Sequence, residues 1–110
     1  MIDWGRVEEL REEVGEEDFL DIAGLFLEEV DEVIKRLTDV PDPAKFEEEL
    51  HFLKGSALNL GFQEFSVLCA TGEKLAARGG AKSVNIAAVV TSYSASRELF
   101  ITQIEPGNTA

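Results

Sequence analysis

The residues best suited to chemistry lie in one stretch, HFLKGSALNLGF, which spans residues 51–62 and contains His51, the only histidine of the chain. An imidazole can act as a nucleophile, a general acid or base, or a metal ligand near neutral pH. Lys54 follows at i+3 and Gly55 at i+4, so a helix would place a cation and a residue without a side chain one turn from the ring. The stretch therefore predicts a reactive histidine with a positive charge and an open space beside it.

Other uses of a histidine fit this stretch poorly. Glu48-Glu-Leu-His51 has the E-x-x-H spacing of di-iron helical bundles, but such a site needs a second histidine, which the chain lacks. Ser56 lies about 140° around the helix from His51, which argues against a serine–histidine pair. The sequence also has no glycine-rich phosphate-binding loop, so we do not expect an ATP-dependent kinase. We expect no metal site.

Segments of helical apolar periodicity, separated by breakers, surround this stretch. Gly15 closes the first segment, residues 40–43 end the second, and Asp42 is placed to cap the third. Gly61 ends the third segment, and Ser83 is placed to cap the last. The expected helices are residues 4–14, 19–37, 43–60, 65 to the glycine pair at 79–80, and 86–104.

Short connections between amphipathic helices favour antiparallel neighbours. The sequence therefore predicts an all-α fold, an up-and-down antiparallel four-helix bundle with a short extra N-terminal helix. We expect a single domain over residues 1–105, followed by a frayed C-terminal tail over residues 106–110.

A helical wheel at about 100° per residue gives the third helix a clear apolar face. His51 lies about 140° from Phe46 and Gly55 about 180° from it, which places both on the solvent side. An exposed glycine costs a helix about 1 kcal/mol relative to alanine, so Gly55 either leaves room for a partner's backbone or is a tolerated defect. The residues within roughly 40° of Phe46 are Leu50, Leu53, Ala57 and Leu60.

The composition of the chain limits the classes of partner and the cellular location that we expect for the protein. A net charge of −12 argues against binding to nucleic acid or to an anionic membrane. The single cysteine, Cys69, excludes an internal disulfide and a cysteine-rich zinc site, so we expect a cytoplasmic protein with this thiol in its core. The N-terminus lacks the pattern of a secretory signal, and no apolar stretch approaches the roughly 20 residues needed to cross a bilayer.

Taken together, these features resemble the histidine-containing phosphotransfer (HPt) domain. The motif of that family, H-x-L-K-G-S, reads here as HFLKGS from His51, with Lys54 and Gly55 in place, and LGF at residues 60–62 closes it. The likeness continues through Gln63 and the helix after it, and the expected helical layout agrees with it.

The resemblance implies a phosphorelay carrier of two-component signalling. His51 would accept a phosphoryl group on a ring nitrogen from an aspartyl phosphate or from a sensor or hybrid histidine kinase. It would then pass the group to the aspartate of a response-regulator receiver domain. Lys54 would offset charge on the phosphoryl oxygens, with a solvated surface lysine as the alternative. The chain would need no cofactor, because the receiver would supply Mg²⁺, and it would be a carrier rather than an enzyme.

The resemblance also implies a partner surface around the histidine. Gly55 would leave space for the receiver, Leu58 would belong to its docking patch, and Gln63 would reach back to hydrogen-bond near the ring. Phe52, by contrast, is expected to pack under the neighbouring helices. A second class of function is a helical adaptor that binds a receiver or kinase without phosphoryl transfer. The intact histidine favours the carrier, since a pure adaptor has no need of a nucleophile.

Overall fold

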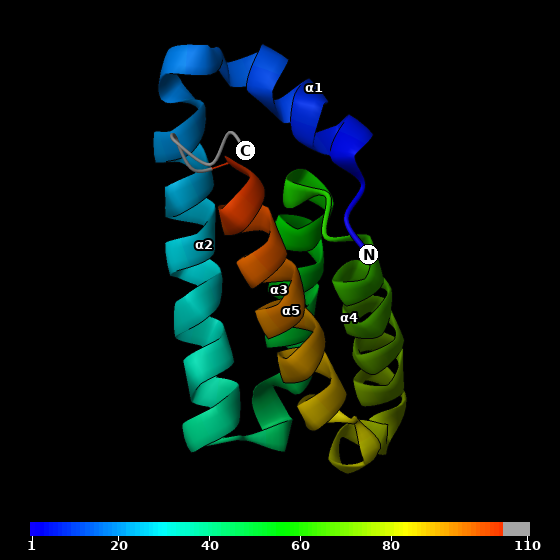
Figure 1. Cartoon of the computed structure of the whole chain (residues 1–110). Helices are drawn as coiled ribbons and strands as arrows, with labels where there is room; N and C mark the ends of the chain where they lie inside the picture. The colour runs from blue at the N-terminus through cyan, green and yellow to red at the C-terminus, as the bar shows by residue number, and fades with distance from the viewer. Residues whose placement is uncertain (105–110) are drawn as a thin grey trace.

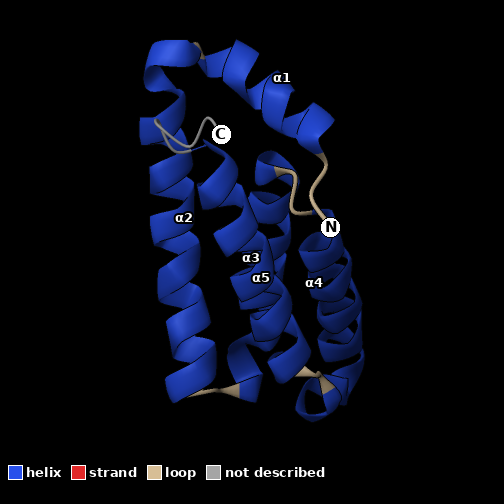
Figure 2. Ribbon diagram, viewed as in Figure 1, coloured by secondary structure: helices blue, strands red, loops and turns tan. Residues whose placement is uncertain are grey.

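The computed structural model describes residues 1–104, so the tail expected at residues 106–110 lies outside the described residues. No residue from 1 to 104 belongs to a β-strand, which confirms the all-α expectation (Figure 2). Between the α-helices, residues 1–104 also contain three short turns: η1 (Pro43–Lys45) and η3 (Ala81–Ser83) are 3₁₀ turns, and η2 (Ala76–Gly80) is a π-helical turn. The α-helices are α1 (Trp4–Val14), α2 (Glu16–Asp39), α3 (Phe46–Leu60), α4 (Gln63–Leu75) and α5 (Ile86–Ile104).

Helices α2 to α5 form a bundle in which successive helices run in opposite directions along the long axis (Figure 1). Helix α3 packs against α2 on one side and α4 on the other, and α5 contacts both α2 and α4. Helix α1 crosses one end of the bundle and contacts α2 and α3. The fold is therefore the predicted helical bundle with an extra N-terminal helix. Within residues 1–104, no helix has the length and apolar character needed to span a membrane.

The apolar faces of the helices meet in one core, whose burial is the main force holding the bundle together. The rings of Phe62 and Phe100 pack edge to face at 5.3 Å between centroids, and Phe65 lies 5.1 Å from Tyr93. Such pairs add about 0.5–1.5 kcal/mol beyond the area they bury. Cys69 is fully buried in this core, as expected, and burial raises the pKa of its thiol to about 12.

Local capping chemistry decides where the helices begin. The Asp42 side chain accepts a hydrogen bond from a backbone N–H at 3.1 Å, as predicted, but a 3₁₀ turn follows and α3 begins only at Phe46. The prediction that Ser83 caps the last helix is wrong, because Ser83 ends the separate turn η3. Asn85 caps α5 instead, since its side-chain oxygen accepts from the Ala88 N–H at 3.0 Å.

The turn between α3 and α4 positions the candidate site. Gly61 ends α3 with φ +77°, in the left-handed region that favours glycine. A Cβ at this position would lie 2.6 Å from the Asp3 carbonyl oxygen, and the Asp3 N–H donates to the Gly61 carbonyl at 2.7 Å. The close approach of these two backbones therefore requires glycine. Helix α4 starts two residues later and runs back along α3.

Candidate functional site

His51 lies in the middle of α3, and its side chain is 69% exposed. On either side of it in the sequence, Leu50 and Leu53 are fully buried and anchor the helix to the core. This alternation confirms the solvent-side position that the wheel predicts. Ser56 is buried, so it does not share the exposed face with the ring. The two buried leucines thus anchor this part of α3 in the core while the imidazole of His51 stays accessible.

A carboxylate on the neighbouring helix contacts the ring. Because α4 runs antiparallel to α3, Glu73 lies beside His51, and its Oε2 is 2.8 Å from the ring nitrogen Nδ1. The other oxygen of the same carboxylate, Oε1, is 2.7 Å from Lys54 Nζ. Glu73 therefore bridges the two residues that the sequence motif singles out. Its side chain is 20% exposed and that of Lys54 is 30% exposed, so the ion pair is half-buried.

The charge state of Glu73 follows from these contacts. The bond from Lys54 lowers the pKa of the Glu73 carboxyl below its ordinary value; His51 adds to this effect and burial opposes it. Glu73 is therefore ionised at neutral pH, and an ionised carboxylate can only accept hydrogen bonds. The proton of a neutral His51 ring must then sit on Nδ1, which leaves the lone pair on Nε2. The site consequently presents an oriented nitrogen nucleophile at the protein surface.

Sequence reasoning did not identify Glu73. The available signal was the position of the turn at Gly61, since His51 lies ten residues before it and Glu73 twelve residues after it. Two antiparallel helices joined by a tight turn place residues at similar distances from that turn side by side. Counting outward from Gly61 would have limited the partners of His51 to the last turns of α4, although several of their residues are polar.

Gly55 lies one turn from His51 on the exposed side of α3. A Cβ built at Gly55 would meet no atom within 4 Å outside its own helix backbone and chain neighbours. No neighbouring element therefore requires glycine here, and the backbone has ordinary helical geometry. Packing does not explain the glycine at this position, and the missing side chain leaves open space beside the His51 ring.

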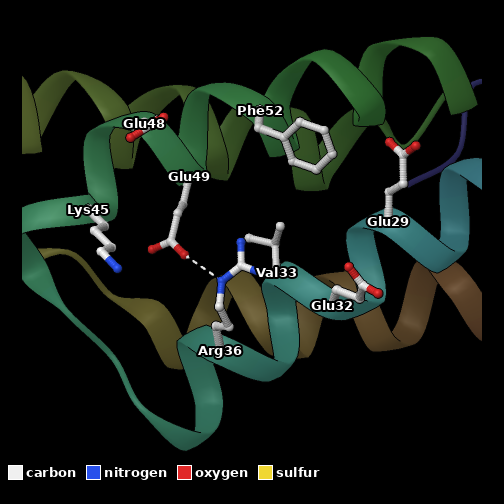
Figure 3. A pocket seen from close by; sticks show the side chains of 8 residues that line it. All are labelled: Glu29, Glu32, Val33, Arg36, Lys45, Glu48, Glu49 and Phe52. Atoms are coloured by element: carbon white, nitrogen blue, oxygen red, sulfur yellow. Dashed lines mark hydrogen bonds and ion pairs between the residues drawn. The ribbon is translucent and has the colours of Figure 1, made fainter.

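The two exposed apolar positions of α3 lie on different sides of the helix. Leu58 is 58% exposed. Phe52 was expected to pack under the neighbouring helices, but it is 37% exposed. Its ring lies at a groove between α2 and α3, together with Val33 and several charged side chains (Figure 3). Across this groove, Arg36 Nε donates to Glu49 Oε2 at 3.3 Å, so α2 offers mostly charged groups toward the ring and covers it only in part.

Gln63 does not come near His51. It is the first residue of α4, and it lines a surface hollow with Leu58, Arg6 and Gly61. His51 lies nine residues before the end of α3, which is roughly 14 Å of helix. Glu73 occupies the position near the ring that was expected for Gln63. Gln63 lies at the start of α4 next to the turn, and only the last part of α4 reaches the level of His51.

Comparison with known proteins gives one match. The model of a family described as Hpt domain matches residues 21–103, about three quarters of the chain. The matched region contains His51, Lys54 and Glu73, whereas α1 lies outside it. No curated protein and no solved structure matches the chain.

Proposed function

The chain belongs to the Hpt domain family, and from this membership and the geometry around His51 we propose that it carries a phosphoryl group on that histidine. Hpt domains act in the phosphorelays of two-component signalling, where they interact with receiver domains and histidine kinases. In our proposal, this chain accepts the group from a sensor or hybrid kinase or from a phosphorylated receiver, and passes it to the aspartate of a response-regulator receiver.

The proposed step is an in-line displacement at phosphorus. The lone pair of His51 Nε2 attacks the phosphorus of a receiver aspartyl phosphate, and the N–P bond forms as the P–O bond breaks. The electron pair of the broken bond stays on the receiver's aspartate as a carboxylate. The Nδ1 proton stays on the ring against Glu73. Transfer in the opposite direction reverses each of these changes.

The remaining contributions are divided between the two proteins. Phosphoryl transfer depends chiefly on positioning and on charge neutralisation. Lys54 supplies a positive charge one turn from the ring, and the receiver supplies the Mg²⁺. Gly55 leaves space for the receiver, and the exposed side chain of Leu58 belongs to the docking patch. This chain then needs neither a cofactor nor an ATP site.

One observation carries this proposal. The only histidine of the chain is exposed, and a carboxylate engages one of its nitrogens so that the other is left as a nucleophile. A helical adaptor would bind the same partners without any need for an oriented imidazole. We therefore favour the carrier over the adaptor.

The first test is a transfer assay from receiver domains charged with radiolabelled phosphate. We expect acid-labile, alkali-stable label on the parental chain and none on His51→Gln. The substitution should leave the thermal melt nearly unchanged, because an exposed ring contributes little to the core. Label that persists on a folded His51→Gln protein would exclude His51 as the acceptor. Stable binding of a receiver with no label on the parental chain would favour the adaptor.

A further inference from the structure

Glu73 has two partners, and only one of them is the nucleophile. The carboxylate holds His51 Nδ1 at 2.8 Å through Oε2 and Lys54 Nζ at 2.7 Å through Oε1. We propose that Glu73 competes with the phosphoryl group for Lys54 and thereby shortens the lifetime of phosphorylated His51. This inference rests on the proposed function, and it assigns to Glu73 the role of a positioning residue that acts through Lys54.

The charges around the ring make this competition strong. A phosphoryl group brings about two negative charges at neutral pH. The hollow at His51 is lined by Glu47 and Glu48 from the preceding turn of α3 and by Glu73 from α4. Within the described residues, Lys54 is the one lysine or arginine that forms an ion pair with a residue of this hollow. The phosphoryl group therefore enters acidic surroundings in which the nearby ammonium group of Lys54 is already paired with the Glu73 carboxylate.

Lys54 can reach either partner. It lies at i+3 from His51, so the two side chains are neighbours on the helix surface. Its ammonium group sits on a flexible four-carbon stem and can turn among acceptors. Gly55, the residue next to it, places no side chain between the stem and solvent. Exchange of Lys54 from Glu73 to a phosphoryl oxygen thus requires side-chain rotation and no movement of the bundle.

The competition favours release of the group. When the phosphoryl group leaves, the N–P bond breaks, its electron pair returns to Nε2, and an oxygen of the receiver's aspartate forms the new P–O bond. Without a receiver, a water oxygen forms that bond and its proton goes to solvent. Lys54 then returns fully to Glu73, and the ring is left neutral with its proton on Nδ1. Glu73 thereby stabilises the unphosphorylated state through Lys54. This arrangement suits a phosphorelay carrier, which must keep the phosphoryl group only until it transfers the group to the next protein.

The test compares the half-life of phospho-His51 in the parental chain and in Glu73→Gln. Glutamine keeps an oxygen that can accept from Nδ1 but has no charge with which to hold Lys54. We expect the half-life to rise about tenfold, and transfer to a receiver to slow by a similar factor; tenfold corresponds to about 1.4 kcal/mol. The matched control is Glu48→Gln, which removes one charge from the same hollow without touching Lys54 and should change the half-life by less than about threefold.

A double-mutant cycle with Lys54→Ala separates this mechanism from a direct effect on the ring. If Glu73 acts through Lys54, Glu73→Gln should lengthen the half-life by less than about threefold once Lys54 is absent. An unchanged half-life in Glu73→Gln, or an equal effect with and without Lys54, overturns the inference while the proposed function stands. A parental chain that accepts no phosphoryl group overturns both.

Discussion

Two carboxylates in this bundle each contact two side chains of one other helix, and the two pairs of partners differ in their chemistry. Asp31 of α2 accepts from Arg97 Nε at 3.0 Å and from Arg97 Nη2 at 2.9 Å, and the Tyr93 hydroxyl of α5 also donates to it. Glu73 of α4 contacts His51 and Lys54 on α3. The first cluster ties α2 to α5, and the second lies at the candidate site.

The partners of Asp31 have fixed charge and geometry. Arg97 binds the carboxylate through two parallel bonds, and Asp31 raises the pKa of its guanidinium further above an already high ordinary value. Burial, with Asp31 next in importance, raises the pKa of the Tyr93 hydroxyl, which therefore stays protonated. Glu73 instead holds an imidazole with a free lone pair and an ammonium on a flexible stem. A carboxylate thus joins two helices at Asp31, whereas in our proposal the carboxylate of Glu73 orients a nucleophile.

Among substitutions that distinguish the Glu73 cluster from the Asp31 cluster, we expect Lys54→Ala to have the largest effect, on the rate of phosphoryl transfer. If Lys54 offsets phosphoryl charge, its loss should slow transfer into His51 by roughly ten- to a hundredfold, or about 1.4–3 kcal/mol in the barrier. Stability should change by less than about 1 kcal/mol, because the pair with Glu73 is partly exposed. Rapid-quench labelling and thermal melts measure both quantities. A parental transfer rate would make Lys54 an ordinary surface lysine.

The opposite pattern is expected from Asp31→Ala. Removing the carboxylate leaves Arg97 without its ion-pair partner, and it leaves the Tyr93 hydroxyl with only the Leu27 carbonyl oxygen, 3.5 Å away, as an acceptor. This loss should lower the free energy of unfolding by about 1–2 kcal/mol. The figure stays small because Asp31 and Arg97 are each 38% exposed and water screens the pair. Urea denaturation checks it, with Glu32→Ala on the same helix as the control. A transfer rate that falls along with stability would show that the two clusters are not independent.

The smallest effect is expected from Gly55→Ala, which should raise helix stability by up to about 1 kcal/mol because the added Cβ meets open space. A longer side chain, in Gly55→Gln, should also favour the helix but obstruct a receiver that approaches the ring. Melting temperature and transfer rate to one receiver should then move in opposite directions. Parental transfer by a Gly55→Gln protein that melts higher would mean that the open space has no role.

The fold was predictable because local signals agree with one another. Apolar periodicity identifies each helix, and the breaks at residues 40–43 and at Gly61 separate them. The exposed position of His51 followed from the same periodicity, since the core residues on either side leave one face for it. Where two capping residues compete within a few positions, as Ser83 and Asn85 do, the outcome depends on a short 3₁₀ turn that periodicity does not reveal.

Features that depend on how two helices lie side by side were not predictable. Glu73 comes to His51 only through the alignment of α4 on α3, and the same alignment leaves Gln63 far from the ring. Phe52 faces α2, and whether that helix covers it depends on the side chains that α2 presents there. A helical wheel gives the direction of each side chain on one helix, but it does not identify the residue that the side chain meets on the neighbouring helix.

The separation of partners along the chain has a consequence for conformational entropy. His51 and Glu73 are 22 residues apart, whereas Asp31 and Arg97 are 66 residues apart. The entropy lost on closing a loop grows with the logarithm of its length, so the threefold longer span costs about 1 kcal/mol more to close. His51 and Glu73 lie in one helical hairpin, so an unfolded chain loses less conformational entropy to bring them together than to bring Asp31 of α2 to Arg97 of α5.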